Sequence, residues 1–327
     1  LVKILQLIID PLRISEKKNK RGAPRKYSNK SILKIFIAMV FLKISSLRSM
    51  ERTLKKNSLL KTACKIVGAP SYRTLGRRLP KTIEVIYPLV IQLLTFITET
   101  GLISWRLASI DSTILQASGK EEQRKWVDGK PTGKILQKPT DQDAKWGYSA
   151  GKDKYIFGYK LHLIVLVKPL IIPLCWMTTS AAPHDTNFFK PLSSVAYRIG
   201  RSLSRLIAVF LGDKGYDSYQ NRNYAVALEN ARLVAPIRDM KGRMSGRRKI
   251  IDEFNHSPMG KRLLKRRSDV ERLFEHFKDL FFVDPLPVKG KENVTAYLSI
   301  ANLAYLSAVV YNIKAGRNPR EIKSLIY

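Results

Sequence analysis

Three acidic residues lie where carboxylates could act together on one substrate. Asp111 in Ser-Ile-Asp-Ser-Thr and Asp213 in Phe-Leu-Gly-Asp-Lys-Gly each accompany an apolar run, and Glu271 lies in a helical pattern. An acid at the end of a strand in an open sheet faces the crevice where ligands bind. Three such carboxylates could hold two Mg²⁺ or Mn²⁺ ions, which activate the attacking oxygen and stabilise the leaving oxygen of a phosphodiester. Taken singly, each Asp is more typical of a turn or a cap.

The segment around Glu271 has the spacing of an amphipathic helix. Arg267, Glu271 and Lys278 are related by i, i+4 and i+11, which places one carboxylate between two cations along one helix edge. The neighbouring edge is apolar and predicted to be buried; it consists of Val270, Leu273, Phe274, Phe277 and Phe281. A carboxylate on a rigid helix flanked by cations suits both a metal and a polyanion. The alternative is an ordinary salt-bridged polar face.

The composition points to a polyanionic partner. The 327 residues contain 59 Lys and Arg against 26 Asp and Glu, which gives a net charge of +33. So large a positive charge on a chain with 45% hydrophobic residues favours nucleic-acid binding, although a ribosomal or membrane-surface protein remains open. Cys64 and Cys175 lie in apolar surroundings and are predicted to be buried thiols, not a disulfide or zinc site. The apolar runs 35–42 and 296–311 are shorter than a bilayer span and are predicted to be buried helices.

The first 80 residues carry 20 Lys and Arg against three acids. Residues 15–30 are predicted to form a flexible basic arm, followed by helices capped by Ser28 or Asn29, by Ser46 and by Ser71. In the helix 72–79 the apolar residues face inward and Arg73 and Arg77 face outward, with Arg78 beside them. Short helices ending in a basic one resemble a helix-turn-helix module that contacts DNA. A small bundle with a solvated basic face is the alternative.

After a helix over 83–100 the pattern changes to alternating and β-branched. Strands are predicted over 106–115, 155–167, 170–178, 205–211 and 232–237, and helices over 185–201, 219–230, 267–278 and 293–313. Residues 118–153 are polar and predicted to be a surface excursion, and residues 238–267 form a basic segment. This order of elements predicts a mixed α/β fold.

The order of the three acids, with the residues around them, resembles the DDE transposases of prokaryotic insertion sequences. The shared motifs are Gly-Asp-Lys-Gly-Tyr-Asp at Asp213 and Arg-x3-Glu-x6-Lys at Glu271. Asp-Gln-Asp-Ala-Lys-Trp at 141–146 and Phe-Gly-Tyr-Lys-Leu-His at 157–162 also resemble the family's approach to its second strand, and 21–79 is similar to its N-terminal helical domain. The combination is specific, whereas each motif alone is weak.

The resemblance implies a fold, a chemistry and a set of roles. It implies a separate all-α DNA-binding domain over 1–100, in which the basic residues described above, Arg73, Arg77 and Arg78, are the expected DNA contacts. It also implies an α/β catalytic domain over 101–327 with a ribonuclease H-like mixed sheet flanked by helices. Asp111, Asp213 and Glu271 carry over as catalytic ligands of two Mg²⁺ or Mn²⁺ ions, and Arg267 and Lys278 as DNA-phosphate contacts. The implied reaction is cleavage of the element ends, followed by joining of the freed 3′-hydroxyl to target DNA.

The chain departs from this family pattern in two places. The subgroup with the Tyr-x2-Arg-x3-Glu-x6-Lys helix signature has Tyr where this chain has Leu264, which puts the Tyr contact to phosphate and the handling of a hairpin intermediate in doubt. About 27 residues, 240–266, separate the last strand from the Glu271 helix, so the large β-rich insertion of some relatives is reduced or absent.

The expected partners are double-stranded DNA, as terminal inverted repeats and target, and a second copy of the chain on DNA, without a membrane. The expected location is the prokaryotic cytoplasm, at the nucleoid. Two other classes stay open. One is a structure-selective nuclease on the same fold, and the other is a catalytically silent DNA-binding relative.

Overall fold

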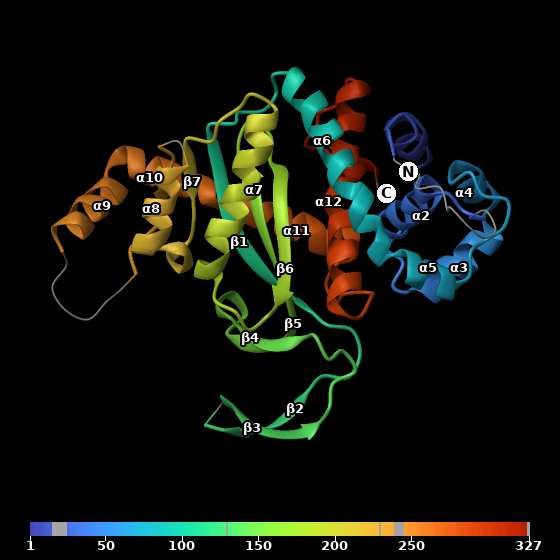
Figure 1. Cartoon of the computed structure of the whole chain (residues 1–327), viewed down its shortest axis with the longest axis horizontal. Coiled ribbons are helices and arrows are strands. Elements are labelled where there is room, and N and C mark those ends of the chain that lie inside the picture. Colours follow the sequence, from blue (N-terminus) through green and yellow to red (C-terminus); the bar gives the residue numbers. More distant parts are fainter. Residues whose placement is uncertain (15–24, 129, 229, 239–244, 326–327) are drawn as a thin grey trace.

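The structure is a computed structural model that describes residues 1–14, 25–128, 130–228, 230–238 and 245–325. Most of the predicted basic arm, residues 15–24, lies outside the described residues, as do residues 239–244 of the basic segment. A twisted sheet occupies the centre of the molecule (Figure 1). The short helices of the N-terminal part lie at one end of the molecule, and α8, α9 and α10 lie at the other.

The central sheet is mixed. Its strands are β1 (Leu107–Gln116), β4 (Lys145–Ser149), β5 (Lys154–Leu166), β6 (Ile172–Ser180), β7 (Val209–Leu211) and β8 (Arg232–Val234). β5 is the antiparallel partner of β1 on one edge and of β6 and β4 on the other. β1, β7 and β8 are parallel, with Ser109 opposite Leu211. The mixed α/β prediction is therefore confirmed, and the parallel half brings the ends of β1 and β7 together.

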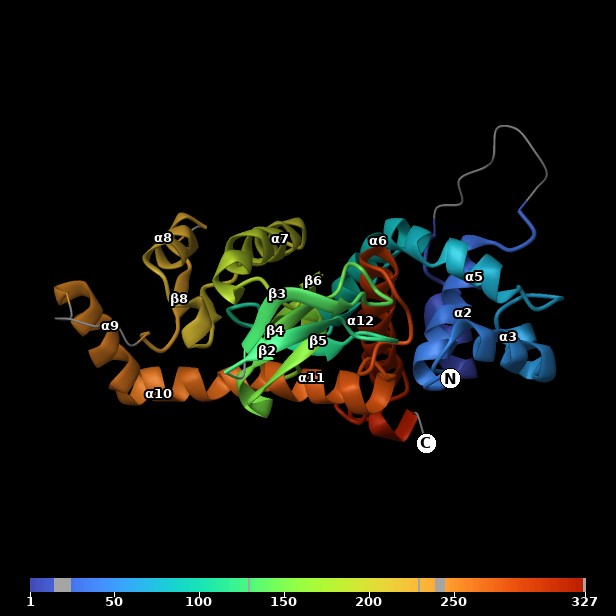
Figure 2. The same cartoon turned by 90° about the horizontal axis from the view of Figure 1, so that it is seen from below.

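Helices cover both faces of the sheet. The helices that follow the sheet strands are α7 (Phe189–Ser202), α8 (Tyr219–Ala227), α9 (Gly246–His256), α10 (Pro258–Leu264), α11 (Ser268–Phe281) and α12 (Lys291–Lys314). α7 and α8 lie on one side of the sheet, whereas α10 and α11 follow one another along the opposite side (Figure 2). α11 packs on β1 and β5 through the apolar edge predicted from its sequence, all of which is buried. Its polar edge is thereby held next to β1.

The first hundred residues are helical. The helices are α1 (Val2–Ile4), a π-helical turn η1 (Leu5–Ile9), α2 (Asn29–Phe41), α3 (Leu47–Lys56), α4 (Ser58–Ala63), α5 (Tyr72–Arg78), a 3₁₀ turn η2 (Pro80–Thr82) and α6 (Ile83–Glu99). Ser28, Ser46 and Ser71 accept hydrogen bonds from the backbone N–H groups three residues ahead, as predicted for helix caps. Pro88 lies inside α6, and Gly101 after it has a positive φ of 70°, the conformation that glycine tolerates at a helix end.

The buried helix α12 joins these helices to the sheet. It packs on β6 on one side and on α2 and α6 on the other, and Trp176 Nε1 of β6 donates to Ser299 Oγ at 2.8 Å. One hydrophobic core therefore runs from Ile4 to Ile322, across the proposed boundary at residue 100, which itself stays a prediction. By length and hydropathy α12 and the segment Pro80–Glu99 could each cross a membrane, but 94% of the α12 window is buried inside the protein, as in a core helix.

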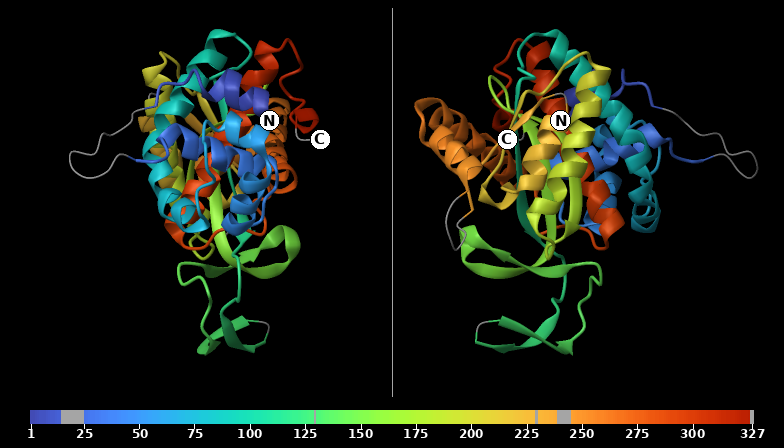
Figure 3. Two further views of the ribbon diagram at one scale, coloured as in Figure 1. Left: turned by 90° about the vertical axis from the view of Figure 1, so that its right-hand side faces the viewer. Right: turned by 60° about the vertical axis from the view of Figure 1, so that its left-hand side comes forward.

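Two segments have more structure than the sequence indicates. The polar excursion 118–153 contains β4 and a two-stranded ribbon of β2 (Gln123–Val127) and β3 (Lys130–Gln137). The ribbon stands away from the body of the molecule in both views of Figure 3. The basic segment before Glu271 forms α9, α10 and a 3₁₀ turn, η6 (Lys265–Arg267). Both segments are mainly polar, so neither has the apolar periodicity that identifies a strand or helix.

Candidate catalytic site

The first two predicted acids are brought together by the parallel pair β1 and β7. β7 ends at Leu211, opposite Ser109, and Asp111 and Asp213 each lie two residues farther along their chains. The Asp111 side chain is 15% exposed, and its Oδ1 accepts the backbone N–H of Ser112 at 2.8 Å. Asp213 begins the 3₁₀ turn η5 (Lys214–Tyr216), and its Oδ1 is buried without a hydrogen-bond partner among the described residues.

Glu271 approaches the same region from α11. Arg267, which immediately precedes α11, places Nη1 2.7 Å from Glu271 Oε1 and 3.8 Å from Asp111 Oδ2. The Ser109 hydroxyl donates to the Arg267 carbonyl at 3.4 Å, which ties the start of the helix to β1. The predicted neighbours Arg267 and Glu271 are thus paired, and Arg267 joins Glu271 to Asp111. The Glu271 side chain is 46% exposed and open to solvent on this side.

The electrostatics indicate a crowded set of negative charges. Burial and then the charge of Asp213 raise the pKa of Asp111 to about 7, with a smaller contribution from Glu271. Burial and then the charge of Asp185 raise the pKa of Asp213. The charges of Asp213 and Glu271 therefore both act on Asp111. Among the described residues, however, no group of three His, Cys, Asp or Glu side chains is close enough to hold a metal ion.

Lys278 lies about two helical turns after Glu271 and contacts β1. Its Nζ donates to Thr113 Oγ1 at 2.8 Å, two residues along β1 from Asp111. Burial lowers the pKa of Lys278, and its side chain is half-buried. Arg267 and Lys278, predicted on one helix edge with Glu271, both reach β1, and the DNA contacts expected of the two cations stay predictions.

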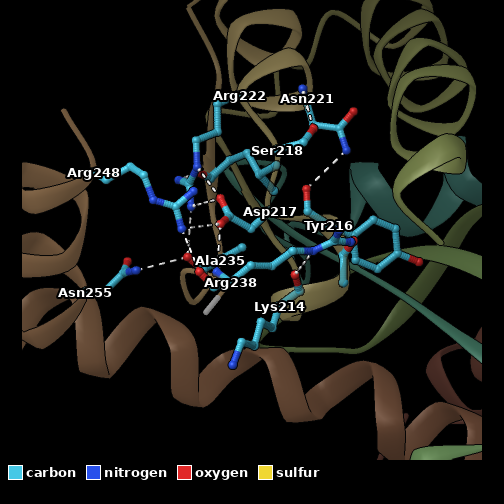
Figure 4. Close-up of polar contacts among 12 residues, drawn as sticks. Lys214, Tyr216, Asp217, Ser218, Asn221, Arg222, Ala235, Arg238, Arg248 and Asn255 are labelled. Carbon is cyan, nitrogen blue, oxygen red and sulfur yellow. Dashed lines mark hydrogen bonds and ion pairs between the residues drawn. The ribbon is translucent and has the colours of Figure 1, made fainter. Parts of the chain in front are cut away.

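The turn that carries Asp213 is held by an arginine network that the sequence reasoning missed (Figure 4). Asp217 accepts from Arg222 Nε at 3.0 Å and from the backbone N–H of Arg238 at 2.9 Å. Arg238 in turn donates from Nε to the Lys214 carbonyl at 3.0 Å and from Nη2 to the Gly215 carbonyl. The Gly-Tyr-Asp motif after Asp213 thus anchors its own turn.

The three basic residues predicted on α5 have different surroundings. Arg73 and Arg77 are exposed, as expected, and a groove of about 1080 Å³ beside them is lined by Arg25, Lys26, Arg77 and Lys81 among others. Arg78 is half-buried and donates to the Tyr27 carbonyl at 3.2 Å and to Asn29 Oδ1 at 2.7 Å. Arg78 therefore links α5 to the start of α2, and it also lines the groove. The helix α5 and the strands β1 and β7 lie on opposite sides of α12 (Figure 1).

The two cysteines, Leu264 and Asp185 lie outside the group of three predicted acids. Cys64 and Cys175 are both free and buried, as predicted. Leu264, at the position of the subgroup's Tyr, is the last residue of α10 and is partly buried. Asp185 was not singled out from the sequence, but its charge acts on Asp213; it begins a 3₁₀ turn, η4 (Asp185–Phe188), where a helix start was predicted.

Comparison with known proteins gives a family. A profile described as "Transposase DDE domain" matches residues 106–307, which is more than half of the chain and includes Asp111, Asp213 and Glu271. No curated protein matches the chain.

Among solved structures, the piggyBac transposase synaptic complex with hairpin DNA has a TM-score of 0.45 and 10% identity, over 100% of this chain and 75% of that chain. The Mos1 transposase paired-end complex with the left transposon end has a TM-score of 0.24 and 10% identity, over 83% and 82% of the two chains. The Mos1 mariner paired-end complex with Mn has a TM-score of 0.24 and 11% identity, over 90% and 81%. Such low scores carry no weight for assignment, whereas the profile covers the strands and helix that hold the three acids. On that match, the chain belongs to the transposase DDE domain family.

Proposed function

We propose that the chain is a DNA transposase of the prokaryotic insertion-sequence type, which cleaves element ends and joins the freed 3′-hydroxyl to target DNA. The observation that carries the proposal is the common location of Asp111, Asp213 and Glu271 within a transposase DDE domain. The net charge of +33 supports a DNA substrate, because counterions released from the phosphates favour binding. The proposed fold class of residues 101–327 is ribonuclease H-like.

The three acids have the chemistry expected of a divalent-metal site. They offer only oxygen ligands, which Mg²⁺ and Mn²⁺ prefer, and the buried Asp213 Oδ1 lacks a partner among the described residues. Mutual repulsion between Asp111 and Asp213 would be relieved by a bound cation. We propose that Asp111, Asp213 and Glu271 hold two such ions. When bound, these would activate the attacking oxygen and stabilise the leaving oxygen of the phosphodiester.

The cations of the chain have separate proposed roles. Arg267 holds the Glu271 and Asp111 carboxylates near each other through its ion pairs. Together with Lys278, it attracts DNA phosphates to a site that the acids would otherwise make repulsive. Arg73 and Arg77 contact the terminal inverted repeats from α5, beside the basic groove. Two element ends must be paired before joining, so the active form is a dimer on DNA. The proposed location is the prokaryotic cytoplasm, at the nucleoid.

A plasmid assay tests this function. Supercoiled plasmid carrying the flanking element ends is incubated at low salt with Mg²⁺ or Mn²⁺ and the native chain, Asp213→Ala, or Asp279→Ala, an exposed acid on α11. The proposal predicts metal-dependent cleavage at the ends and strand joining by the native chain and Asp279→Ala, and neither by Asp213→Ala. Equal cleavage by all three would refute the role of Asp213. Cleavage that shows no preference for the element ends and no strand joining would support a structure-selective nuclease. Binding of the ends without cleavage would support a catalytically silent DNA-binding relative.

A further inference from the structure

The side chain of Arg238 binds the turn that follows Asp213 (Figure 4). Its Nε donates to the Lys214 carbonyl at 3.0 Å, and its Nη2 donates to the Gly215 carbonyl. Nη2 also donates to the Thr186 hydroxyl of η4 at 2.6 Å. One guanidinium therefore engages both peptide bonds within η5 and joins them to the neighbouring turn.

The backbone of Arg238 is itself held on both sides. Asp217 Oδ2 accepts its N–H at 2.9 Å, and Arg248 Nη2 donates to its carbonyl at 2.7 Å. Asp217 is held in turn by Arg222, whose Nε donates to it at 3.0 Å. A planar guanidinium loses less freedom for each hydrogen bond that it forms than a flexible ammonium group does. Arg238 is therefore a fixed support for η5.

The same two peptide bonds direct their N–H groups toward Asp213. In a planar trans peptide the C=O and N–H groups point in opposite directions, so a hydrogen bond to the Lys214 carbonyl fixes the direction of the Gly215 N–H. In the same way, a hydrogen bond to the Gly215 carbonyl fixes the direction of the Tyr216 N–H. Burial raises the pKa of Asp213, and hydrogen bonding from these two N–H groups acts in the opposite direction.

The Asp213 carboxyl also lies directly against Gly215. A Cβ added at Gly215 would be 2.8 Å from Asp213 Oδ1 and 3.2 Å from Oδ2. Oδ1 is buried without a hydrogen-bond partner among the described residues, so no direct bond to Oδ1 fixes the carboxyl there. The orientation of the carboxyl therefore depends on how the peptide bonds of η5 are turned.

We propose that Arg238 is a positioning residue for Asp213: by binding the Lys214 and Gly215 carbonyls, it holds the Asp213 carboxyl in the orientation that the proposed reaction uses. The inference deepens the proposed function and rests on it. Direct contact with a DNA phosphate is the other role open to an arginine at this place. The protein already engages both Nε and Nη2, which favours positioning.

The conservative variant Arg238→Lys tests the inference in the full chain. It keeps the charge and the backbone hydrogen bonds, but one ammonium group cannot reproduce the planar fork. We expect the metal-dependent cleavage rate at saturating element-end DNA to fall about 10- to 100-fold, with the KM for DNA unchanged. In the metal-free protein we expect faster amide hydrogen exchange in peptides covering 213–217, measured by mass spectrometry. The control is Arg320→Lys, at an exposed arginine that also donates to a backbone carbonyl, that of Pro169, and should change neither quantity.

Chemical rescue provides a second test, because the Arg238 side chain is only half-buried and its site can admit a small cation. In Arg238→Ala we expect added methylguanidinium to restore part of the cleavage rate and the slow amide exchange of 213–217. Tetramethylammonium at the same concentration has no N–H group to donate and should restore neither.

The outcomes separate this inference from the proposed function. A native cleavage rate in Arg238→Lys, with or without a lower melting temperature, would overturn the inference alone. A raised KM for DNA at an unchanged rate would assign Arg238 to DNA contact and also overturn it, as would a slower rate with unchanged amide exchange. An absence of rescue by methylguanidinium in folded Arg238→Ala would count equally against it. No cleavage by the native chain would overturn the proposed function and this role with it.

Discussion

Replacing Asp111 by Asn should stabilise the metal-free protein at high pH. In the folded chain burial and the Asp213 charge raise the pKa of Asp111 to about 7, about three pH units above its ordinary value of 3.8. At a pH between these two values the Asp111 carboxyl is ionised in the unfolded chain and protonated in the folded chain. The free energy of unfolding therefore falls as pH rises through this range, and the decrease is complete above about pH 7. Asn stays neutral and avoids that loss.

The magnitude follows from the difference in pKa. Three pH units correspond to about 4 kcal/mol at 1.36 kcal/mol per unit. The Asp111 side chain is 15% exposed and Arg267 lies nearby, so we expect roughly 2–4 kcal/mol in favour of Asp111→Asn at pH 8.5 and almost no difference near pH 4. The same variant should lose its metal-dependent stabilisation.

Urea unfolding in EDTA at pH 4, 7 and 8.5 measures this difference in the free energy of unfolding. Asp279→Asn, at an exposed position on the same helix as Glu271, is the control and should show no such pH dependence. A less stable Asp111→Asn protein at pH 8.5, or a gain that is equal at all three values, would refute the argument that buried like charges surround Asp111.

Four further substitutions probe the turn after Asp213 and the basic helix α5. Asp217→Asn should lower the free energy of unfolding by roughly 3–5 kcal/mol, measured by urea unfolding, because the largely buried Arg222 guanidinium loses its charged partner and the Arg238 backbone N–H loses its carboxylate acceptor; wild-type stability would contradict this. Gly215→Ala should reduce DNA cleavage at little cost in melting temperature, because the added Cβ would lie 2.8 Å from Asp213 Oδ1; unchanged cleavage would show that the carboxylate position is unimportant. Arg77→Gln should reduce the slope of log affinity for element-end DNA against log salt concentration by about 0.9, measured by binding titrations. Arg78→Gln should instead lower the free energy of unfolding by about 1–3 kcal/mol, measured by melting curves, because its hydrogen bonds to Tyr27 and Asn29 are lost. A salt slope changed only by Arg78→Gln, with stability lowered only by Arg77→Gln, would refute these roles.

Local patterns predicted much of the fold because they act over a few residues. The caps at Ser28, Ser46 and Ser71 follow from a side-chain oxygen that reaches a backbone N–H three residues ahead. The apolar edge of α11 is buried as its helical spacing indicates. β5 was recognised from its apolar and β-branched run.

Other features depend on contacts between distant residues. β2 and β3 are polar strands that stand away from the core, so they leave no alternating apolar pattern to read. Arg78 was expected to contact DNA together with Arg73 and Arg77, but its guanidinium also donates to Asn29, 49 residues away, a contact that no local pattern indicates. Asp185 approaches Asp213 only because Thr186 and Gly215 meet across 29 residues, which no local pattern reveals.

The most direct test of the carboxylate site is anomalous diffraction from crystals of the full chain soaked in Mn²⁺. We expect an anomalous peak in contact with Asp111 and Asp213, with Glu271 turned toward it, and no such peak in crystals of Asp213→Asn. A soaked native crystal with no peak at these residues, or with peaks only elsewhere, would contradict the claim that they bind the metal.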